Sequence, residues 1–335
     1  MRRELMGASA HWSGLGRVFE ATTAPTGALV LMYHSIQHGD ASHFVDPANA
    51  LPVDMFERQM AFLGKHRKVV PLSELVAQIR AGATPSKDTV CITFDDGYLD
   101  NLTVAAPILK RHGFAATLYL ATGYIGRAES QWSDVLHTSV VRRTRSRLKL
   151  ALPGLNDVNL DAPAERGTAL RLVRSHLLEA TYEVRSEVLS EVVRQLAPDV
   201  EMPRLTMNWD DARRLRDEYP LFEFGGHTRN HIDLRAQPVA SATAEIESCS
   251  QDIRRELGIT PQHFSFPYGR WNARCREVVA GAGWSSAMGS GVDLRIGPNS
   301  DIFAMPRIEA PRFMTDFRFK TSGAHPGLFA ALGWH

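Results

Sequence analysis

The chain has 335 residues, of which 44% are hydrophobic, and its 38 basic residues nearly balance its 37 acidic ones. This length allows one large α/β domain or two small ones, and a net charge of +1 gives no argument for nucleic acid or an anionic membrane as a partner. The three cysteines, Cys91, Cys249 and Cys275, are typical of free thiols in a reducing compartment and do not indicate a disulfide framework.

Residues 1–26 show no sustained hydrophobic periodicity and are predicted to form a loosely ordered leader. Arg2 and Arg3 are followed by polar and small residues, not by the apolar core of a signal peptide. No apolar run reaches the roughly 18 residues that a membrane-spanning helix needs. We therefore expect a cytoplasmic protein without a transmembrane segment.

Apolar runs then alternate with helical patterns up to about residue 126. Runs of five to seven apolar residues are typical of strands that are buried on both faces of a sheet. Apolar residues at intervals of three and four predict helices between these strands. We predict strands at 28–33, 89–94 and 114–120, and helices that begin at Asp54 as a cap, at Ser73 and at about Leu102.

The alternation is interrupted between residues 127 and 203. This segment contains a loop rich in proline, glycine and asparagine at 153–163, followed by helical periodicity from Leu170 to Val192. We predict a mostly helical insertion. The alternation resumes with strands at 221–224 and 263–266 and helices at 209–218 and 240–257, and it continues to about residue 308.

This arrangement favours a parallel α/β sheet or a closed β/α barrel. The barrel is preferred because polar groups follow four different predicted strands, and β/α folds assemble their active sites at the carboxyl ends of strands. We predict a barrel over 27–126 and 204–320, an insertion over 127–203 and a tail over 321–335. The strand-end groups are His34, Asp95 with Asp96, His227, and Pro267 with Tyr268.

The polar groups at these strand ends include a candidate metal site. Asp96, His227 and His231 match the three protein ligands of a catalytic zinc site, which leaves the fourth position to water or substrate. The four-residue spacing places both histidines on one side of a helical turn or of a tight loop. Asp95 would then act as general base on the water.

Hydrolysis of an acyl group also requires an oxyanion donor and a general acid. The turn of Pro267, Tyr268 and Gly269 offers a backbone N–H for the oxyanion, and His34 is the candidate acid for the leaving amine. Taken singly, each motif has a simpler explanation: Asp-Asp-Gly is usually a turn, and two histidines often share a helix face by chance. Their combination at strand ends favours metal-assisted hydrolysis.

Three motifs carry a family resemblance: Thr93-Phe-Asp-Asp-Gly97, His227-Thr-Arg-Asn-His231 and Phe266-Pro-Tyr-Gly269. In this order they resemble the polysaccharide deacetylases, also called the NodB-homology domain or carbohydrate esterase family 4, over most of 28–310 outside the insertion. The resemblance implies a distorted (β/α)7 barrel, a divalent metal that is usually zinc, and removal of N- or O-acetyl groups from sugars. It implies that Asp95 is the base and that Asp96, His227 and His231 bind the metal.

The segment Leu31-Met-Tyr-His34, followed by Phe56 to Leu63, resembles the exopolysaccharide branch that includes poly-N-acetylglucosamine deacetylases. In that branch the histidine of the catalytic acid stands at the front of the domain, which corresponds to His34. The sequence departs from the family in its third motif, where Ser265 and Phe266 occupy the region of an arginine that often restrains the base. No late Leu-x-His element follows.

The sequence therefore predicts a metal-dependent deacetylase that hydrolyses N-acetyl groups, or alternatively O-acetyl groups, on a sugar of a surface polysaccharide, an exopolysaccharide or its precursor. Its partner would be this acetylated glycan or sugar precursor, and peripheral association with membrane-bound glycan synthesis stays open. Two alternatives stay open. One is a deformylase or amidase that acts on a small amide with the same fold, and the other is a non-catalytic carbohydrate-binding barrel. No oligomeric state is predicted.

Overall fold

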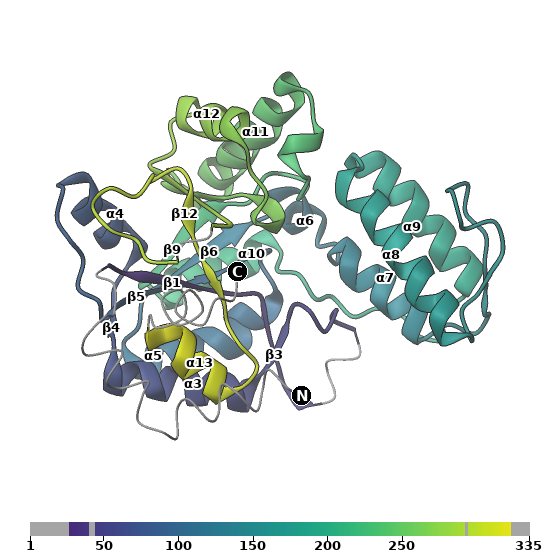
Figure 1. Ribbon diagram of the computed structural model, residues 1–335, viewed down its shortest axis with the longest axis horizontal. Coiled ribbons are helices and arrows are strands. Elements are labelled where there is room, and N and C mark those ends of the chain that lie inside the picture. The colour runs from purple at the N-terminus through teal and green to yellow at the C-terminus, as the bar shows by residue number, and fades with distance from the viewer. Residues whose placement is uncertain (1–26, 40–43, 292–293, 323–335) are drawn as a thin grey trace, which may run out of the picture.

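The computed structural model describes residues 27–39, 44–291 and 294–322 (Figure 1). The predicted leader, 1–26, lies outside these residues, as does all of the predicted tail after Ser322. Thr321 and Ser322 themselves end the last helix, α13. Among the described residues, no helix combines the length and the apolar character that crossing a membrane would require.

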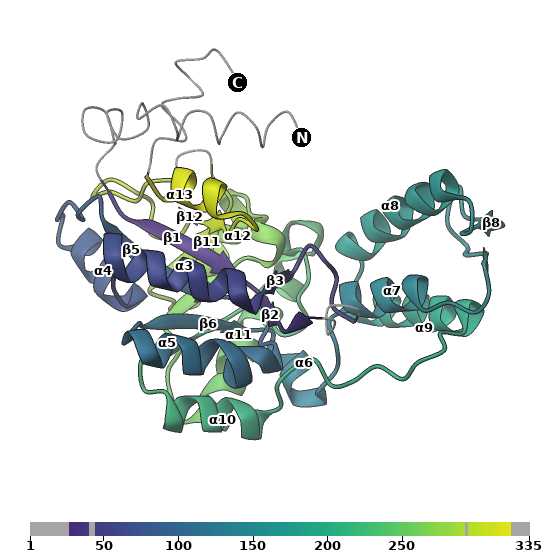
Figure 2. The same ribbon diagram turned by 90° about the horizontal axis from the view of Figure 1, so that it is seen from below.

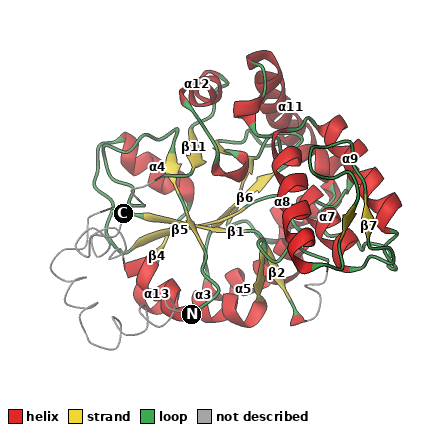
Figure 3. Cartoon of the chain, turned by 45° about the vertical axis from the view of Figure 1, so that its right-hand side comes forward, coloured by secondary structure: helices red, strands yellow, loops and turns green. Residues whose placement is uncertain are grey.

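Parallel strands form a nearly closed barrel with helices around it (Figures 1 and 3). The sheet runs in the order β12-β11-β10-β9-β6-β5-β1-β13, and β4 also pairs with β5. Its strands are β1 (Leu29–Tyr33), β4 (Lys68–Val69), β5 (Thr89–Phe94), β6 (Ala116–Leu120), β9 (Phe222–Gly226), β10 (His263–Ser265), β11 (Ser286–Gly289), β12 (Met305–Pro306) and β13 (Ile308–Glu309).

One segment closes this barrel. The strands β12 and β13 are separated only by Arg307, yet β12 pairs with β11 at one edge of the sheet and β13 pairs with β1 at the other. Residues 305–309 therefore act as a single strand position, and together with β1, β5, β6, β9, β10 and β11 they make seven. This topology confirms the predicted distorted (β/α)7 barrel.

Helices cover the outside of the barrel because each presents one apolar face to the strands. The helix α3 buries Phe56, Met60 and Leu63. The prediction that Asp54 caps this helix is wrong. The helix begins directly after Pro52, and Asp54 lies in its first turn. The helices are α3 (Val53–His66), α4 (Leu72–Arg80), the π-helix η2 (Asn101–Ala105), α5 (Ala106–His112), α6 (Thr122–Arg127), α10 (Trp209–Glu218), α11 (Val239–Leu257), α12 (Ala273–Gly281) and α13 (Met314–Ser322).

Short elements complete the rim of the barrel. The strands β2 (Ser35–Gln37) and β3 (Ala50–Pro52) form a small parallel pair after β1. Two single-turn 3₁₀ helices, η3 (Leu234–Ala236) and η4 (Pro267–Gly269), lie in the loops after β9 and β10.

The insertion projects to one side of the barrel as a bundle of α7 (Trp132–Val141), α8 (Pro163–Glu179) and α9 (Tyr182–Leu196) (Figure 2). A small antiparallel pair, β7 (Arg147–Leu148) and β8 (Val158–Asn159), joins α7 to α8. The helical periodicity that the sequence shows here covers two helices, because Thr181 caps α9 by accepting a hydrogen bond from Val184. The insertion has its own apolar core, which includes Leu136, Leu148, Leu155, Leu160, Val173, Leu177, Val192 and Leu196.

Candidate active site

The carboxyl ends of the barrel strands bring the predicted residues to one pocket of about 450 Å³. Asp95 and Asp96 follow β5, His227 follows β9, Tyr268 and Gly269 follow β10, and His34 follows β1. His231 and all of these residues line the pocket, whereas Pro267 is buried and does not. The structure thus assembles the residues that the sequence predicted, with the exception of Pro267.

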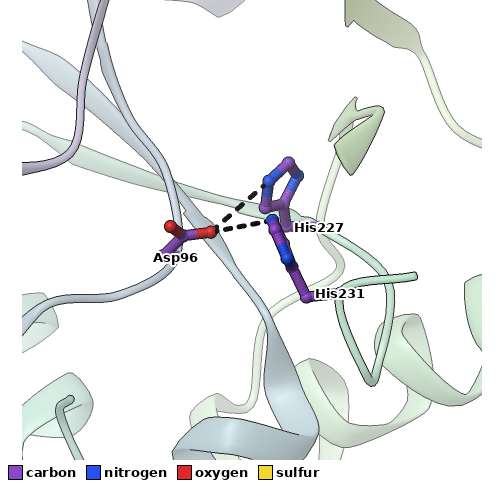
Figure 4. Close-up of side chains that lie close together, drawn as sticks. All are labelled: Asp96, His227 and His231. Atoms are coloured by element: carbon purple, nitrogen blue, oxygen red, sulfur yellow. Dashed lines mark ion pairs between the residues drawn. The ribbon is translucent and has the colours of Figure 1, made fainter. Parts of the chain in front are cut away.

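Asp96, His227 and His231 form a compact group of potential metal ligands (Figure 4). Oδ1 of Asp96 lies 3.2 Å from Nε2 of His231 and 3.6 Å from Nε2 of His227. One ligand atom from each residue lies within 4.8 Å of the others. Oδ1 of Asp96 is also buried and has no hydrogen-bond partner among the described residues. A buried carboxylate oxygen is costly to leave without a partner, so these atoms fit a bound cation.

The backbone around the site adopts conformations that side chains other than glycine rarely take. Asp96, Thr228, His231 and Tyr268 have φ values of 74°, 60°, 51° and 60°. Such strain persists only where the surrounding structure enforces it, and it concentrates at functional sites. The two histidines lie on a tight loop and not on a helical turn, so the loop alternative of the sequence analysis holds.

Two glycines allow β9 to deliver His227. A Cβ atom at Gly226 would lie 2.4 Å from the ring of Trp284, and one at Gly225 would lie 2.5 Å from the carbonyl oxygen of His263. The close approach to β10 lets Nδ1 of His227 bond to the carbonyl oxygen of Ser265 at 2.7 Å. A ring held through Nδ1 presents Nε2 to Asp96, which is the arrangement that metal-binding histidines need.

Burial sets the protonation of these ligands. It lowers the pKa of His227. It also lowers the pKa of His231 well below the usual value, and the positive charge of Arg185 acts in the same direction. Both imidazoles are therefore held neutral, as ligation requires. Burial and the negative charge of Asp95 raise the pKa of Asp96 well above its usual value. A cation beside Asp96 would reverse that effect.

Arg307 holds Asp95 through two hydrogen bonds. Its Nη1 donates to Oδ1 at 2.7 Å and its Nη2 donates to Oδ2 at 2.6 Å. Nη2 also donates to the hydroxyl of Ser265 at 2.7 Å. This arginine supplies the restraint that the third motif lacks, and it does so from the segment that closes the barrel. Burial opposes the charge of Asp95, but Arg307 outweighs it and holds the pKa of Asp95 below its usual range.

Arg307 is a residue that the sequence analysis missed. It stands 212 positions after Asp95, between two strands of two residues each that carry no motif. The nearest signal was negative, namely the absence of an arginine before Pro267. A search for an arginine at another strand end could have followed from it.

His34 lies half-buried at the end of β1 and lines the same pocket as Asp95. Its carbonyl oxygen accepts a hydrogen bond from Asn101 at 2.7 Å, and the N–H of Asp95 donates to the carbonyl oxygen of Tyr33 at 3.0 Å. These bonds fix the end of β1 against the end of β5. Burial lowers the pKa of His34, and the charge of Asp95 opposes this effect.

Tyr268 connects the barrel site to the insertion. Its hydroxyl donates to the carbonyl oxygen of His231 at 3.0 Å and accepts from Nε1 of Trp132 at 2.8 Å. Its ring meets the imidazole of His231 edge to face, with 4.6 Å between the ring centres. The insertion therefore borders the site, and Trp132, Ser133, Arg174 and Leu178 line the same pocket.

The family that matches this chain is described as polysaccharide deacetylase, and its sequence model aligns with residues 82–147 and 174–287, more than half of the chain. The YxkH protein of Bacillus subtilis (strain 168), whose name places it among polysaccharide deacetylases, is 31% identical over 140 residues. That alignment covers 40% of this chain and 47% of YxkH, so the chain matches about half the length of this relative.

Two solved structures share the fold. The deacetylase PplD of Streptococcus pyogenes, in complex with acetate, aligns with a TM-score of 0.59 and 17% identity over 89% of this chain and 99% of that one. IcaB from Ammonifex degensii aligns with a TM-score of 0.57 and 15% identity over 90% of this chain and 98% of that one. With the family match, the motifs and the fold in agreement, the chain belongs to the polysaccharide deacetylases, a family of hydrolases.

Proposed function

We propose that this protein is a metal-dependent deacetylase that hydrolyses the acetyl amide of an N-acetylated sugar in a glycan or a glycan precursor. The observation that carries the proposal is the cluster of Asp96, His227 and His231 beside an arginine-paired Asp95 in one pocket. Membership of the family supports the hydrolysis of acetyl groups on glycans.

The donor set favours a divalent metal such as Zn²⁺. Two neutral imidazoles and one carboxylate are common ligands of catalytic zinc, and the pocket leaves room for substrate. When bound, such an ion would lower the pKa of its water to about 7 and polarise the acyl carbonyl. Asp96, His227 and His231 would hold it.

The remaining residues divide the proton transfers between them. Asp95, kept ionised and oriented by Arg307, would take the proton of the attacking water. His34, which lines the same pocket, would give a proton to the departing amine. The N–H of Gly269 is bonded to the carbonyl oxygen of Phe266, and Pro267 has none, so the N–H of Tyr268 is the donor of this turn that could meet the oxyanion.

A second cavity of about 300 Å³ favours a substrate with more than one sugar unit. It shares Met32, His34, Asn49 and Glu309 with the catalytic pocket, so the two cavities adjoin each other. Phe313, with 54% of its surface exposed, lies along this cavity. An aromatic ring beside a groove can pack against the apolar face of a sugar, and a small formyl amide would leave the groove empty.

The test is acetate release by protein that has been stripped of metal and then reloaded with Zn²⁺. The substrates would be N-acetylglucosamine and its oligomers, with O-acetylated and N-formylated sugars in parallel. We expect acetate from the N-acetylated oligomers at a higher kcat/KM than from the monosaccharide. Formate as the preferred product would indicate a deformylase. Bound Zn²⁺ and glycan without any product would indicate a non-catalytic barrel.

A further inference from the structure

We infer that the helical insertion serves the active site through Arg185, a positioning residue that holds the backbone of the metal ligand His231. The inference rests on the proposed metal site, and it assigns a role to a segment that the family motifs do not include. Arg185 lies on α9 of the insertion, whereas His231 lies on the loop after β9 of the barrel.

Arg185 is buried in an unusual way for an arginine. Only 1% of its surface is exposed, and among the described residues its hydrogen bonds go to backbone carbonyl oxygens and none to an acidic side chain. Its Nη1 donates to the carbonyl oxygens of Asn230 at 3.2 Å and of His231 at 3.0 Å, and its Nε donates to that of Leu177 at 3.1 Å. The guanidinium carbon lies 5.4 Å from the centre of the Trp132 ring.

A buried guanidinium without a carboxylate is expensive, because the charge loses its hydration and gains only dipoles and a ring face in return. A leucine or methionine would fill this space between the insertion and the loop at lower cost. What a hydrophobic side chain could not do is donate to two successive carbonyl groups of the metal-ligand loop. The cost is therefore consistent with a requirement for those bonds.

His231 depends on its backbone more than His227 does. The ring of His227 is fixed by the bond from Nδ1 to Ser265, whereas Nδ1 of His231 is buried with no partner among the described residues. The position of His231 is set instead by its carbonyl oxygen, which accepts from both Arg185 and Tyr268, and by the Tyr268 ring against its imidazole.

The backbone of His231 also needs an external restraint. Its φ of 51° lies in the left-handed region, which is unfavourable for a residue with a Cβ atom. The bonds from Arg185 and Tyr268 hold it there with Nε2 directed at Asp96. Loss of Arg185 would let the loop relax and move a ligand, and groups that orient metal ligands typically account for 10- to 100-fold in metal affinity.

The experiment compares Arg185→Met with Arg194→Met in the full chain. Arg194 lies on the same helix but is exposed and pairs with Glu191, so its replacement controls for a charge lost from α9. Zn²⁺ affinity would be measured by competition with a chelator, and the ligand geometry by the absorption spectrum of the Co²⁺-loaded protein. Thermal unfolding of the metal-free protein would report any general loss of stability.

We expect Arg185→Met to weaken Zn²⁺ binding by about 10- to 100-fold and to alter the Co²⁺ spectrum, while Arg194→Met changes neither. Arg185→Lys, which keeps the charge and can donate to one carbonyl, should recover part of the affinity. A variant that melts at a lower temperature but binds Zn²⁺ as tightly as the unsubstituted protein would overturn the inference and leave Arg185 a purely structural residue.

Tyr268→Phe provides a second route if Arg185→Met does not fold. It removes the other donor to the carbonyl oxygen of His231 and keeps the aromatic ring, so a smaller loss of Zn²⁺ affinity is expected. Unchanged affinity would contradict the inference. If the unsubstituted protein binds no Zn²⁺ or Co²⁺, the proposed metal-dependent function fails. If it binds them and the Arg185 variants bind equally well, only the role of Arg185 fails.

Discussion

Asp95 in the barrel and Asp134 in the helical insertion are both almost completely buried, with 2% and 0% of their surfaces exposed. Within the part of the chain that the structure describes, only Asp95 of the two has a cationic partner. Arg307 donates a hydrogen bond to each carboxylate oxygen of Asp95. Asp134, on α7, accepts hydrogen bonds from the N–H of Asp46 at 2.8 Å and the hydroxyl of Tyr98 at 2.9 Å.

The difference separates the carboxylate that we propose as the catalytic base from one that joins the insertion to the barrel. The arginine holds the pKa of Asp95 below its usual range against the effect of burial, so the group is ionised and can accept a proton. Burial raises the pKa of Asp134 to about 7, because its neutral hydrogen-bond donors do not offset the lost hydration. Asp134 instead ties the insertion to Asp46 and Tyr98 at the edge of the pocket.

The largest effect that this comparison predicts is on activity in Asp95→Asn. Asparagine keeps the shape of the side chain but cannot accept the proton of the water, so kcat should fall by about 10²- to 10⁴-fold. Metal content should not change, because Asp96, His227 and His231 remain. Acetate release and metal analysis on the same preparation measure both quantities.

Asp217→Asn, at an exposed residue paired with Arg216 on α10, is the matched control and should retain full activity. If Asp95→Asn keeps activity within a few-fold of the unsubstituted protein, Asp95 is not the base and its contrast with Asp134 has no catalytic meaning.

Arg307→Met should cause the next largest change, a loss of about 3–5 kcal/mol in the free energy of unfolding, because it leaves the buried charge of Asp95 without its partner. Pairing depresses the folded-state pKa of Asp95, so it stabilises the protein above the unfolded pKa of about 3.9, and this stabilisation is lost only as the pH falls through the lower folded pKa. Without Arg307, burial would instead raise the pKa of Asp95, so the carboxyl would take up a proton between pH 7 and pH 4 and would no longer be an unpaired buried charge. The loss in Arg307→Met should therefore be smaller at pH 4 than at pH 7. Urea unfolding at the two pH values measures it.

The double variant Asp95→Asn with Arg307→Met tests the cause. Removing both charges should recover part of the stability that Arg307→Met alone loses. Equal stability of the double variant and Arg307→Met at pH 7 would mean that Arg307 acts mainly by closing the barrel.

Asp134→Asn should have the opposite effect on stability: its free energy of unfolding should rise relative to that of the unsubstituted protein as the pH increases. A raised pKa means that Asp134 contributes stability below its unfolded pKa of about 3.9 and that this contribution is lost as the pH rises towards 7. Asparagine can still accept from Asp46 and can donate to Tyr98. The variant should therefore gain on the unsubstituted protein between pH 4 and pH 8, by roughly 4 kcal/mol for about three pKa units. Unfolding curves across this pH range measure the gain. If the variant gains no stability relative to the unsubstituted protein, Asp134 does not differ from Asp95 in the way proposed.

The smallest effect is expected for Trp132→Phe, which tests the contact between the insertion and the barrel. It removes the hydrogen bond from Nε1 to the hydroxyl of Tyr268 and keeps an aromatic ring beneath Arg185. The free energy of unfolding should fall by about 0.5–1.5 kcal/mol, and the catalytic base should be unaffected. Denaturant unfolding measures the stability, and kcat measures the effect on catalysis. A loss of kcat as large as that in Asp95→Asn would contradict the prediction.

The local sequence predicted the barrel strands because continuous apolar runs such as 28–33 and 89–94 have few alternatives to a buried strand. It predicted the ligand set for a related reason. A motif that directly follows such a run is carried to the carboxyl end of a strand, and in a β/α barrel these ends meet at one rim. The motifs therefore predict that Asp96, His227 and His231 lie together.

Other features follow from contacts between distant segments. The start of α3 depended on Pro52 and not on the more obvious Asp54, since a helix can begin without a side-chain cap when its apolar face is buried. Closure of the barrel depended on residues 305–309, which are too short to give a periodic signal but pair with both edges of the sheet.

The sequence by itself determined the family to which this protein belongs and most of the polar residues of its candidate site, since both depend on short motifs at strand ends. Only the tertiary structure decided how those residues are held. Arg307 reaches Asp95 across 212 positions, and Arg185 reaches His231 across 46. A guanidinium acts over a few ångströms in space, and neither neighbouring sequence nor periodicity records which distant carboxylate or carbonyl folding will place beside it.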